Sequence, residues 1–292
     1  MIVTITLNAA LSVSYQTPHL TWDATNQISH VRHRAGGRGV AVARVLHTFG
    51  HEVLAAGFAG GEAGEMIRAD LAQGGIPTAF TRIGKESRRL TEVQDQETGR
   101  CLRFTEPAPY ITTEELGRFA ADYRRLLTDA TAVVLCGSVP AGMPPEIYGT
   151  LATYAAEAGV PAILDAGGPA LHHAATRRPA LVIPDTPPPT TPDPRALVAA
   201  GVGAVALLTD HKVHIITAQS QWQAAIPNAP TAPPWPRDAL VAGLVPGVLL
   251  GWSWPDRLRH AVALAASASS SGEVDLMAYE RLVAEVRIEP SA

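Results

Sequence analysis

The sequence is poor in cysteine. Its 292 residues include two cysteines, Cys101 and Cys136, and their spacing matches no metal-ligand motif. Two cysteines are also too few for the disulfide framework that stabilises many secreted domains. We therefore expect free thiols and a protein of the reducing cytoplasm.

The sequence also lacks an excess of charge of either sign. It has 23 Lys and Arg against 27 Asp and Glu, a formal net charge of -4, and no block of basic residues. Because nucleic acids and anionic membranes attract dense positive charge, we expect neither as a partner. The expected partner is a small molecule.

Long hydrophobic runs are missing as well. The longest, residues 239–252, contains Pro246 and is shorter than the roughly 20 residues that a membrane-spanning helix needs. The first residues, 1–8, have neither the basic region nor the cleavage site of a signal peptide. They read as a β-strand, and the sequence predicts a soluble protein.

The sequence does contain short β-branched runs that alternate with helical patterns. This alternation predicts a mostly parallel sheet with helices on both faces, and 47% hydrophobic residues can form the core of one large α/β domain. Apolar residues at helical spacing from Val42 to Phe49, with Gly50 as a cap, predict one helix, and Asp275 is the expected N-cap of another. The predicted strands are Ile2–Leu7, Ala132–Cys136, Ala162–Asp165, Leu181–Pro184, Val205–Thr209 and Val213–Thr217.

Two segments interrupt this alternation, residues 13–34 and 84–104. In the second, two strand-like runs surround a Glu-Thr-Gly turn. Together the segments predict a small β-lid over the carboxyl edge of the sheet. Two proline-rich stretches, 184–194 and 227–236, predict loops that lead into the regions where α/β enzymes build their sites.

Two glycine-containing motifs are candidates for ligand binding. Gly36-Gly37-Arg38-Gly39 precedes a predicted helix, so backbone N–H groups, the helix dipole and a cation meet where a phosphate could bind. The motif 135–142, L-C-G-S-V-P-A-G, follows a predicted strand at its carboxyl end, where open α/β sheets bind ligands. A tight turn explains either motif without a ligand.

Asp238 also has two possible roles, a catalytic base or an ordinary residue of a helix start. In W-P-R-D-A-L it opens an apolar helix, at a place where a phosphoryl-transfer enzyme could keep its catalytic base. Proline at the first helical position and an acid in the first turn are also good helix openers without any chemistry. The residue pattern leaves both interpretations open.

The order of the motifs resembles the PfkB carbohydrate kinases, closest to the branch of 1-phosphofructokinase and tagatose-6-phosphate kinase. The resemblance rests on T-L-N-A-A-L-S-V-S-Y, A-G-G-R-G-V-A-V-A-R-V-L, S-R-R-L-T-E-V, L-C-G-S-V-P-A-G-M-P and D-A-L-V-A-G, in this order along the chain. It implies a single ribokinase-like domain, a three-layer α/β sandwich with a mostly parallel sheet. It also implies a β-lid from about residues 10–34 and 84–106, which in this family often supports a homodimer.

In such kinases a Gly-Ala-Gly-Asp run opens a helix, its N–H groups hold the transferring phosphoryl group, and the Asp accepts the proton of the sugar hydroxyl. The corresponding residues here are Trp235-Pro236-Arg237-Asp238. The resemblance therefore assigns Asp238 as the base. Pro236 has no N–H to donate, and losing one such donor typically costs about 10²- to 10³-fold in rate. Arg237 could supply the missing charge stabilisation, as arginines do in other phosphoryl transfers.

The nucleotide side departs further from the family pattern. The family's Lys-Pro-Asn-x-x-Glu motif is replaced by residues 183–188, which have Asp185 at the position of the asparagine and no glutamate. The family's Ser-Leu-Gly-x-x-Gly strand end is replaced by residues 207–212, which include Thr209. The resemblance makes Asp185 and Thr209 the candidate cofactor-binding residues. Pro246 is also expected to remove a hydrogen bond from the helix that Asp238 opens and to kink it.

The acceptor side keeps more of the pattern. The residues that the resemblance assigns to the sugar phosphate are Gly37, Arg38, Arg88, Gly137 and Ser138. Polar residues that would contact sugar hydroxyls are replaced by Ser12, Ala41 and Leu90, so the sequence does not name the sugar.

Two functions follow from the resemblance. One is a descendant that has impaired or lost catalysis and uses no cofactor. It binds a phosphorylated metabolite, such as fructose 1-phosphate or tagatose 6-phosphate, or a protein partner through the lid. The other is an active sugar-phosphate kinase that uses ATP and Mg, with Asp238 as base and Arg237 in place of the lost amides.

Overall fold

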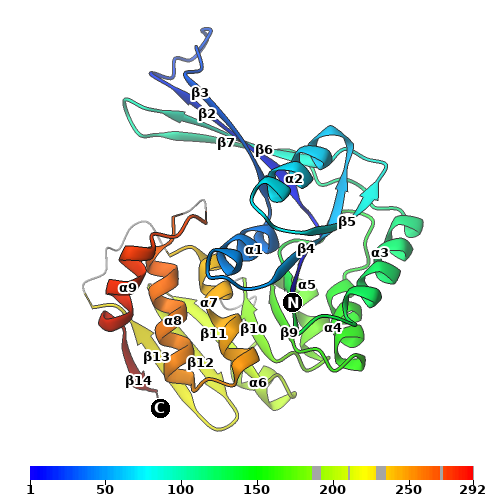
Figure 1. Cartoon of the computed structure of the whole chain (residues 1–292), viewed down its shortest axis with the longest axis vertical. Helices are drawn as coiled ribbons and strands as arrows, with labels where there is room; N and C mark the ends of the chain where they lie inside the picture. The colour runs from blue at the N-terminus through cyan, green and yellow to red at the C-terminus, as the bar shows by residue number, and fades with distance from the viewer. Residues whose placement is uncertain (186–191, 210, 228–234, 270–271, 292) are drawn as a thin grey trace.

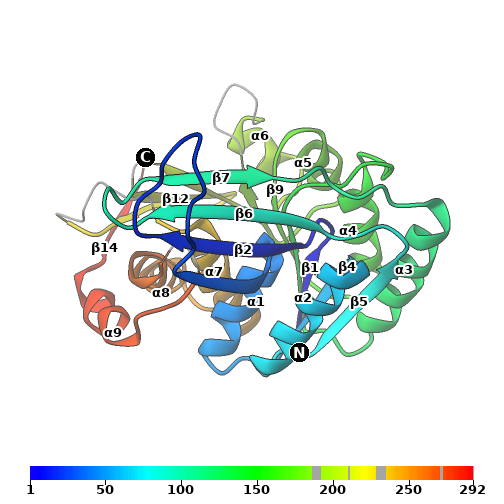
Figure 2. The same cartoon turned by 90° about the horizontal axis from the view of Figure 1, so that it is seen from above.

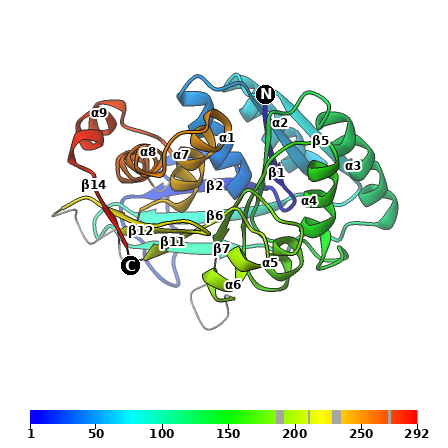
Figure 3. The same cartoon turned by 90° about the horizontal axis from the view of Figure 1, so that it is seen from below.

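The computed structural model describes residues 1–185, 192–209, 211–227, 235–269 and 272–291. In this part of the chain a ten-stranded sheet lies between two layers of helices (Figure 1, Figure 3). The strands from β5 to β11 are parallel, and β12, β13 and β14 are antiparallel. Their spatial order is β14 (Arg287–Pro290), β13 (Gln221–Ala225), β12 (Lys212–Thr217), β11 (Ala204–Thr209), β10 (Leu181–Pro184), β9 (Ala162–Ala166), β8 (Ala132–Cys136), β1 (Ile2–Thr6), β4 (Val53–Gly60) and β5 (Thr78–Ile83).

Each face of the sheet is covered by its own group of helices, which confirms the predicted α/β sandwich. One layer contains α1 (Arg38–Thr48), α2 (Gly61–Gln73), α7 (Arg237–Leu250), α8 (Trp254–Ser267) and α9 (Leu276–Glu285). The other contains α3 (Thr113–Leu126), α4 (Ile147–Glu157), α5 (Gly168–Ala175) and α6 (Pro194–Ala199). The parallel strands β1, β8, β9 and β10 are therefore buried on both sides, which explains why most of them read as continuous apolar runs.

The six predicted strands are present, with ends that differ from the prediction by at most one residue. The two predicted helices are α1 and α9, and the Asp275 carboxylate accepts a hydrogen bond from the Ala278 N–H at 3.0 Å. Helix α7 continues through Pro246 to Leu250. Buried packing against α1 and α8 supports this helix despite the missing N–H.

A second sheet of four strands lies over one end of the first, and we call it the lid sheet (Figure 2). Its order is β3 (His30–Gly36), β2 (Ala10–Thr17), β6 (Arg88–Asp95) and β7 (Cys101–Thr105). The predicted hairpin of residues 84–104 is present as β6 and β7, and Gly99 in its turn has a φ of 68°, which suits glycine.

The pairing register sorts the lid side chains into two faces, because successive side chains of a strand point to opposite sides. One face, which we call the inner face, carries Ser12, Ser14, Arg32, Arg34, Arg88, Leu90, Glu92, Arg103 and Thr105. The other, the outer face, carries Leu11, Val13, Tyr15, Val31, Arg89, Thr91, Val93, Leu102 and Phe104.

No helix within the described ranges is both long and apolar enough to cross a membrane.

Candidate active site

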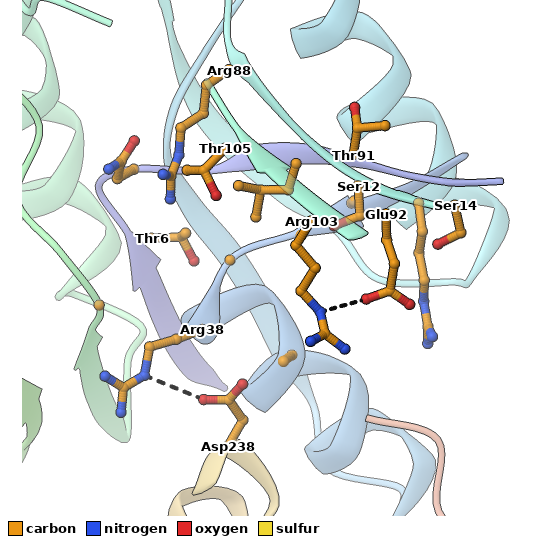
Figure 4. A pocket seen from close by; sticks show the side chains of 18 of the residues that line it. Thr6, Ser12, Ser14, Arg38, Arg88, Thr91, Glu92, Arg103, Thr105 and Asp238 are labelled. Carbon is orange, nitrogen blue, oxygen red and sulfur yellow. Dashed lines mark hydrogen bonds and ion pairs between the residues drawn. The ribbon is translucent and has the colours of Figure 1, made fainter. Parts of the chain in front are cut away.

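A cavity of about 500 Å³ lies between the inner face of the lid sheet and the carboxyl ends of β1 and β8. The start of α1 forms one wall, and Asp238, at the start of α7, closes the floor (Figure 4). Its polar and charged lining residues are Thr6, Asn8, Ser12, Ser14, Arg32, Arg34, Arg38, Arg44, Arg88, Glu92, Arg103, Thr105, Ser138 and Asp238. Thr91 and Phe104, which the register places on the outer face, also border the cavity. The sequence brings these groups together because parallel strands end at one edge of the sheet.

The glycines of the first motif allow close packing at this edge. Gly37 has a φ of 114°, and a Cβ there would lie 2.5 Å from Thr6 Cγ2, so a larger residue would be both strained and in contact with β1. Helix α1 begins after Gly37 with no side-chain cap. Its first N–H groups lie at the cavity, and across it the Asn8 amide donates a hydrogen bond to Ser138 Oγ at 3.0 Å.

Arg38 does not extend into the cavity as a free cation. Its Nη2 donates to Asp165 Oδ1 at 2.6 Å, its Nη1 lies 2.7 Å from Asp185 Oδ2, and its Nε lies 3.4 Å from Asp238 Oδ1. The Asp165 side chain is fully buried at the end of β9, with 0% exposure. One guanidinium group thus joins three carboxyl groups from β9, from the residue after β10 and from α7.

Arg237 binds the same buried carboxyl group from the other side. Its Nε donates to Asp165 Oδ1 at 2.8 Å, and its Nη2 donates to the carbonyl oxygens of Ile183 at 2.6 Å and Pro184 at 2.5 Å. The guanidinium is therefore engaged with the end of β10. We call Arg38, Arg237, Asp165, Asp185 and Asp238 the charge network.

The electrostatics of the charge network follow from burial and from its own charges. Burial opposes the charge of Arg38, but the carboxylates of Asp165, Asp185 and Asp238 raise its pKa above the ordinary value. Burial raises the pKa of Asp238 to about 6; the charge of Asp165 adds to this rise, and those of Arg38 and Arg237 oppose it. With two cations and three ionised carboxylates, the network carries 2 − 3 = −1.

Comparisons with known proteins agree with this architecture. The family model described as pfkB family carbohydrate kinase matches residues 6–186, more than half of the chain. The chain belongs to the PfkB family of carbohydrate kinases.

Solved structures show the same fold over nearly the whole length. A protein described as a possible 1-phosphofructokinase from Thermotoga maritima superposes with a TM-score of 0.86 at 21% identity, covering 100% of both chains. Escherichia coli phosphofructokinase-2 in complex with fructose-6-phosphate gives 0.84 at 22% identity, and its tetrameric inhibited form gives 0.82 at 20%, each covering 97% of this chain and 98% of the other.

The residues expected at the acceptor side of a PfkB kinase do come together. Gly37, Arg38, Arg88, Gly137 and Ser138 all line the cavity, as do the three replaced positions Ser12, Ala41 and Leu90. Gly137 has a φ of 92° and donates its N–H to the Asp165 carbonyl oxygen at 3.1 Å. The sequence motifs thus locate the site, although whether these residues bind a sugar phosphate stays a prediction.

The two residues expected on the nucleotide side do not gather at the cavity as the acceptor-side residues do. Asp185 is engaged by Arg38, and Thr209 is exposed at the end of β11. Neither residue lines the cavity. Most of the two proline-rich stretches, residues 186–191 and 228–234, lies outside the described residues.

The start of α7 differs from the Gly-Ala-Gly-Asp run that the resemblance implies. Pro236 is the N-cap, not the first helical residue as the sequence suggests, and it has no N–H. Trp235 is buried at 8% exposure and makes an edge contact with His211, with ring centroids 5.3 Å apart. Within the described ranges no group of three or more His, Cys, Asp and Glu is placed to hold a metal ion.

Sequence reasoning missed several residues of the site. The sequence patterns place Asp165 only in a predicted strand, although an acid at the end of an otherwise apolar strand is an unusual feature that marks a candidate. Asn8 and the lid arginines Arg32, Arg34 and Arg103 were also missed. Their positions on one lid face depend on the register of β2, which pairs with strands from two separate segments.

The raised pKa of Asp238 predicts a pH dependence of stability. The folded protein holds this proton more tightly than the unfolded chain does, so Asp238 contributes stability below about pH 4 that is lost as the pH rises through 6. Urea unfolding of the native chain and of Asp238→Asn at several pH values checks this. Between pH 4 and 7 the native chain should lose up to about 3 kcal/mol relative to the variant. A difference that stays constant with pH would contradict the assignment.

Proposed function

We propose that this PfkB protein binds a phosphorylated sugar in the cavity beneath the lid sheet and has impaired or lost phosphoryl transfer. The observation that carries the proposal is the charge network. Both cations next to Asp238 are already bound to carboxyl groups of the same chain, at the place where a kinase needs positive charge for the transferring phosphoryl group.

Arg88 supports the binding of a sugar phosphate. It lines the cavity from β6, and its Nε is buried without a hydrogen-bond partner. No carboxylate within the described part of the chain forms an ion pair with it, and burial lowers its pKa. An anion bound there would offset the cost of burying the charged Arg88 side chain. A guanidinium group is well suited to binding phosphate. The uncapped N–H groups of α1 provide further donors at the same wall.

The charge network argues against efficient transfer. To stabilise a phosphoryl group, Arg237 would have to leave three acceptors: Asp165 and the carbonyl oxygens of Ile183 and Pro184. Without Arg237, the buried negative charge of Asp165 would be only partly compensated by Arg38, which is costly in free energy. At neutral pH the network carries a net negative charge, which repels the phosphates of a nucleotide.

Asp238 favours an active kinase as the second candidate function. Its carboxyl group lines the cavity, and a pKa of about 6 suits a general base near neutral pH. In that case Mg-ATP would supply the phosphoryl group, and Asp238 would accept the proton of the sugar hydroxyl.

Isothermal titration calorimetry tests the binding part of the proposal. Fructose 1-phosphate or tagatose 6-phosphate should bind at micromolar to millimolar concentration, and Mg-ATP should bind much more weakly or not at all. A protein that binds Mg-ATP at micromolar concentration but neither sugar phosphate would contradict the proposal.

We also propose a homodimer through the lid sheet. Its outer face exposes Val31 at 47% and Phe104 at 57%, and Trp22 in the β2–β3 loop is 73% exposed. Such apolar groups on one sheet suit contact with a second copy. Light scattering should give the mass of a dimer, and a monomer at micromolar concentration would contradict this.

A further inference from the structure

Two polar side chains meet at the carboxyl edge of the central sheet, where β1 and β8 run side by side. Thr6 pairs with Cys136 in the register of these strands, and Asn8 and Ser138 each lie two residues further along the chain. The Asn8 amide nitrogen donates a hydrogen bond to Ser138 Oγ at 3.0 Å, and both residues line the cavity. Neighbouring strands thus bring an amide and a hydroxyl group together at the wall of the cavity.

The Asn8 side chain makes only this hydrogen bond within the part of the chain that the structure describes. Asn8 is buried, with 7% exposure, and its amide oxygen Oδ1 has no hydrogen-bond partner among the described residues. A buried polar atom without a partner typically costs about 1–3 kcal/mol, so stability of the fold does not explain the amide. Its one contact indicates that Asn8 acts through the Ser138 hydroxyl group.

The backbone next to Ser138 is fixed by buried contacts. The Tyr148 hydroxyl, at 0% exposure, donates to the carbonyl oxygens of Cys136 at 2.7 Å and Gly137 at 3.0 Å. The Gly137 N–H donates in turn to the Asp165 carbonyl oxygen at 3.1 Å. Ser138 itself is exposed and lines the cavity, so a fixed backbone presents its hydroxyl group to a ligand.

The contact with Asn8 determines where the Ser138 hydroxyl can donate its proton. An amide nitrogen donates and does not accept, so Ser138 Oγ accepts from Asn8 and cannot direct its own proton back to that nitrogen. The hydroxyl makes no second hydrogen bond with the described residues. Its proton is therefore left for an acceptor in the cavity, and the oxygens of a phosphate are strong acceptors.

We propose that Asn8 is a positioning residue, which makes the Ser138 hydroxyl a hydrogen-bond donor to the phosphate of the ligand. This inference rests on the proposed binding of a sugar phosphate in the cavity. Arg88, the proposed partner of that phosphate, pairs with Ala10, two residues after Asn8. The guanidinium group and the hydroxyl group therefore belong to the same end of the cavity.

A double-mutant cycle tests the proposal, with the affinity for fructose 1-phosphate measured by calorimetric titration of the full chain. In Asn8→Asp the new carboxylate accepts the Ser138 proton, so this variant should bind about tenfold or more weakly than the native chain. Ser138→Ala should lose a similar factor. In the Ser138→Ala background, only repulsion by the added charge remains, so the effect of Asn8→Asp should be at least about threefold smaller.

Ser14→Ala is the matched control. Ser14 lines the same cavity from β2, whereas the Asn8 amide binds Ser138. The factor by which Asn8→Asp weakens binding should therefore be the same with and without Ser14→Ala. Asn8→Leu, which has a similar shape but no N–H group, replaces Asn8→Asp if thermal unfolding shows that the added charge prevents folding, and its effect should depend on Ser138 in the same way.

The outcomes separate this inference from the proposed function. If the change at Asn8 alters the Kd by the same factor with and without the Ser138 hydroxyl, or leaves the Kd unchanged, Asn8 does not act through Ser138. The inference is then wrong, and the proposed function still stands. If the native chain does not bind fructose 1-phosphate, the proposed function fails and this inference fails with it.

Discussion

Asp165→Asn is expected to destabilise the protein by about 3 kcal/mol. Asp165 is fully buried and is the shared partner of Arg38 and Arg237, whose side chains are 22% and 20% exposed. Removing its charge while keeping its shape leaves Arg237 without a carboxylate and leaves Arg38 with Asp185 and Asp238 alone. Breaking a buried ion pair in this way typically costs about 3–5 kcal/mol. Urea unfolding at pH 7 measures the change.

Glu114→Gln is the matched control for this experiment. Its ion pair with Arg118 lies on the surface of α3, where Glu114 is 83% exposed, so its loss should cost less than about 1 kcal/mol. If Asp165→Asn costs no more than this control, the charge network does not stabilise the fold, and its arginines are available for other partners.

Arg88→Gln is expected to weaken the binding of fructose 1-phosphate by about 30-fold or more. Arg88 is buried in part and has no carboxylate partner within the described residues, so the phosphate is expected to be its main partner. A hydrogen-bonded charged contact contributes about 1.5–3 kcal/mol, and two parallel contacts from one guanidinium contribute more. Calorimetric titration measures the change in Kd.

The neighbouring Arg89 provides the control. Arg89 points to the outer face of the lid sheet, and Glu86 lies 3.4 Å from its Nη2, so Arg89→Gln should leave the Kd within about threefold. Equal losses in the two variants would indicate a general effect of lid charge, and an unchanged Kd in Arg88→Gln would remove Arg88 from the site.

Much of the fold could be predicted from the sequence because its signals are local. Continuous apolar runs such as 132–136 and 181–184 mark strands that are buried on both faces, and an acid such as Asp275 marks where a helix begins. The lid hairpin also has a local signal in its turn. These features depend on residues that are near one another in the chain.

The partners of the charged groups could not be predicted in the same way. The sequence shows Arg38 after two glycines and Arg237 before Asp238, and both suggest free cations at a phosphate site. Their shared partner is Asp165, which is 127 residues from Arg38 and 72 from Arg237. Only the order β10-β9-β8-β1 of the sheet brings these residues to one edge, and that order is a property of the whole fold.

We propose that the charge network holds Arg237 and Asp238 in contacts that prevent efficient phosphoryl transfer. Release of ADP from Mg-ATP in the presence of fructose 1-phosphate, compared between the native chain and Asp238→Asn, tests it most directly. We expect no ADP release above the level of the variant, at concentrations of fructose 1-phosphate that saturate the protein. Release of ADP that requires the sugar phosphate and is lost in Asp238→Asn would show that the site transfers phosphoryl groups, and would contradict the claim.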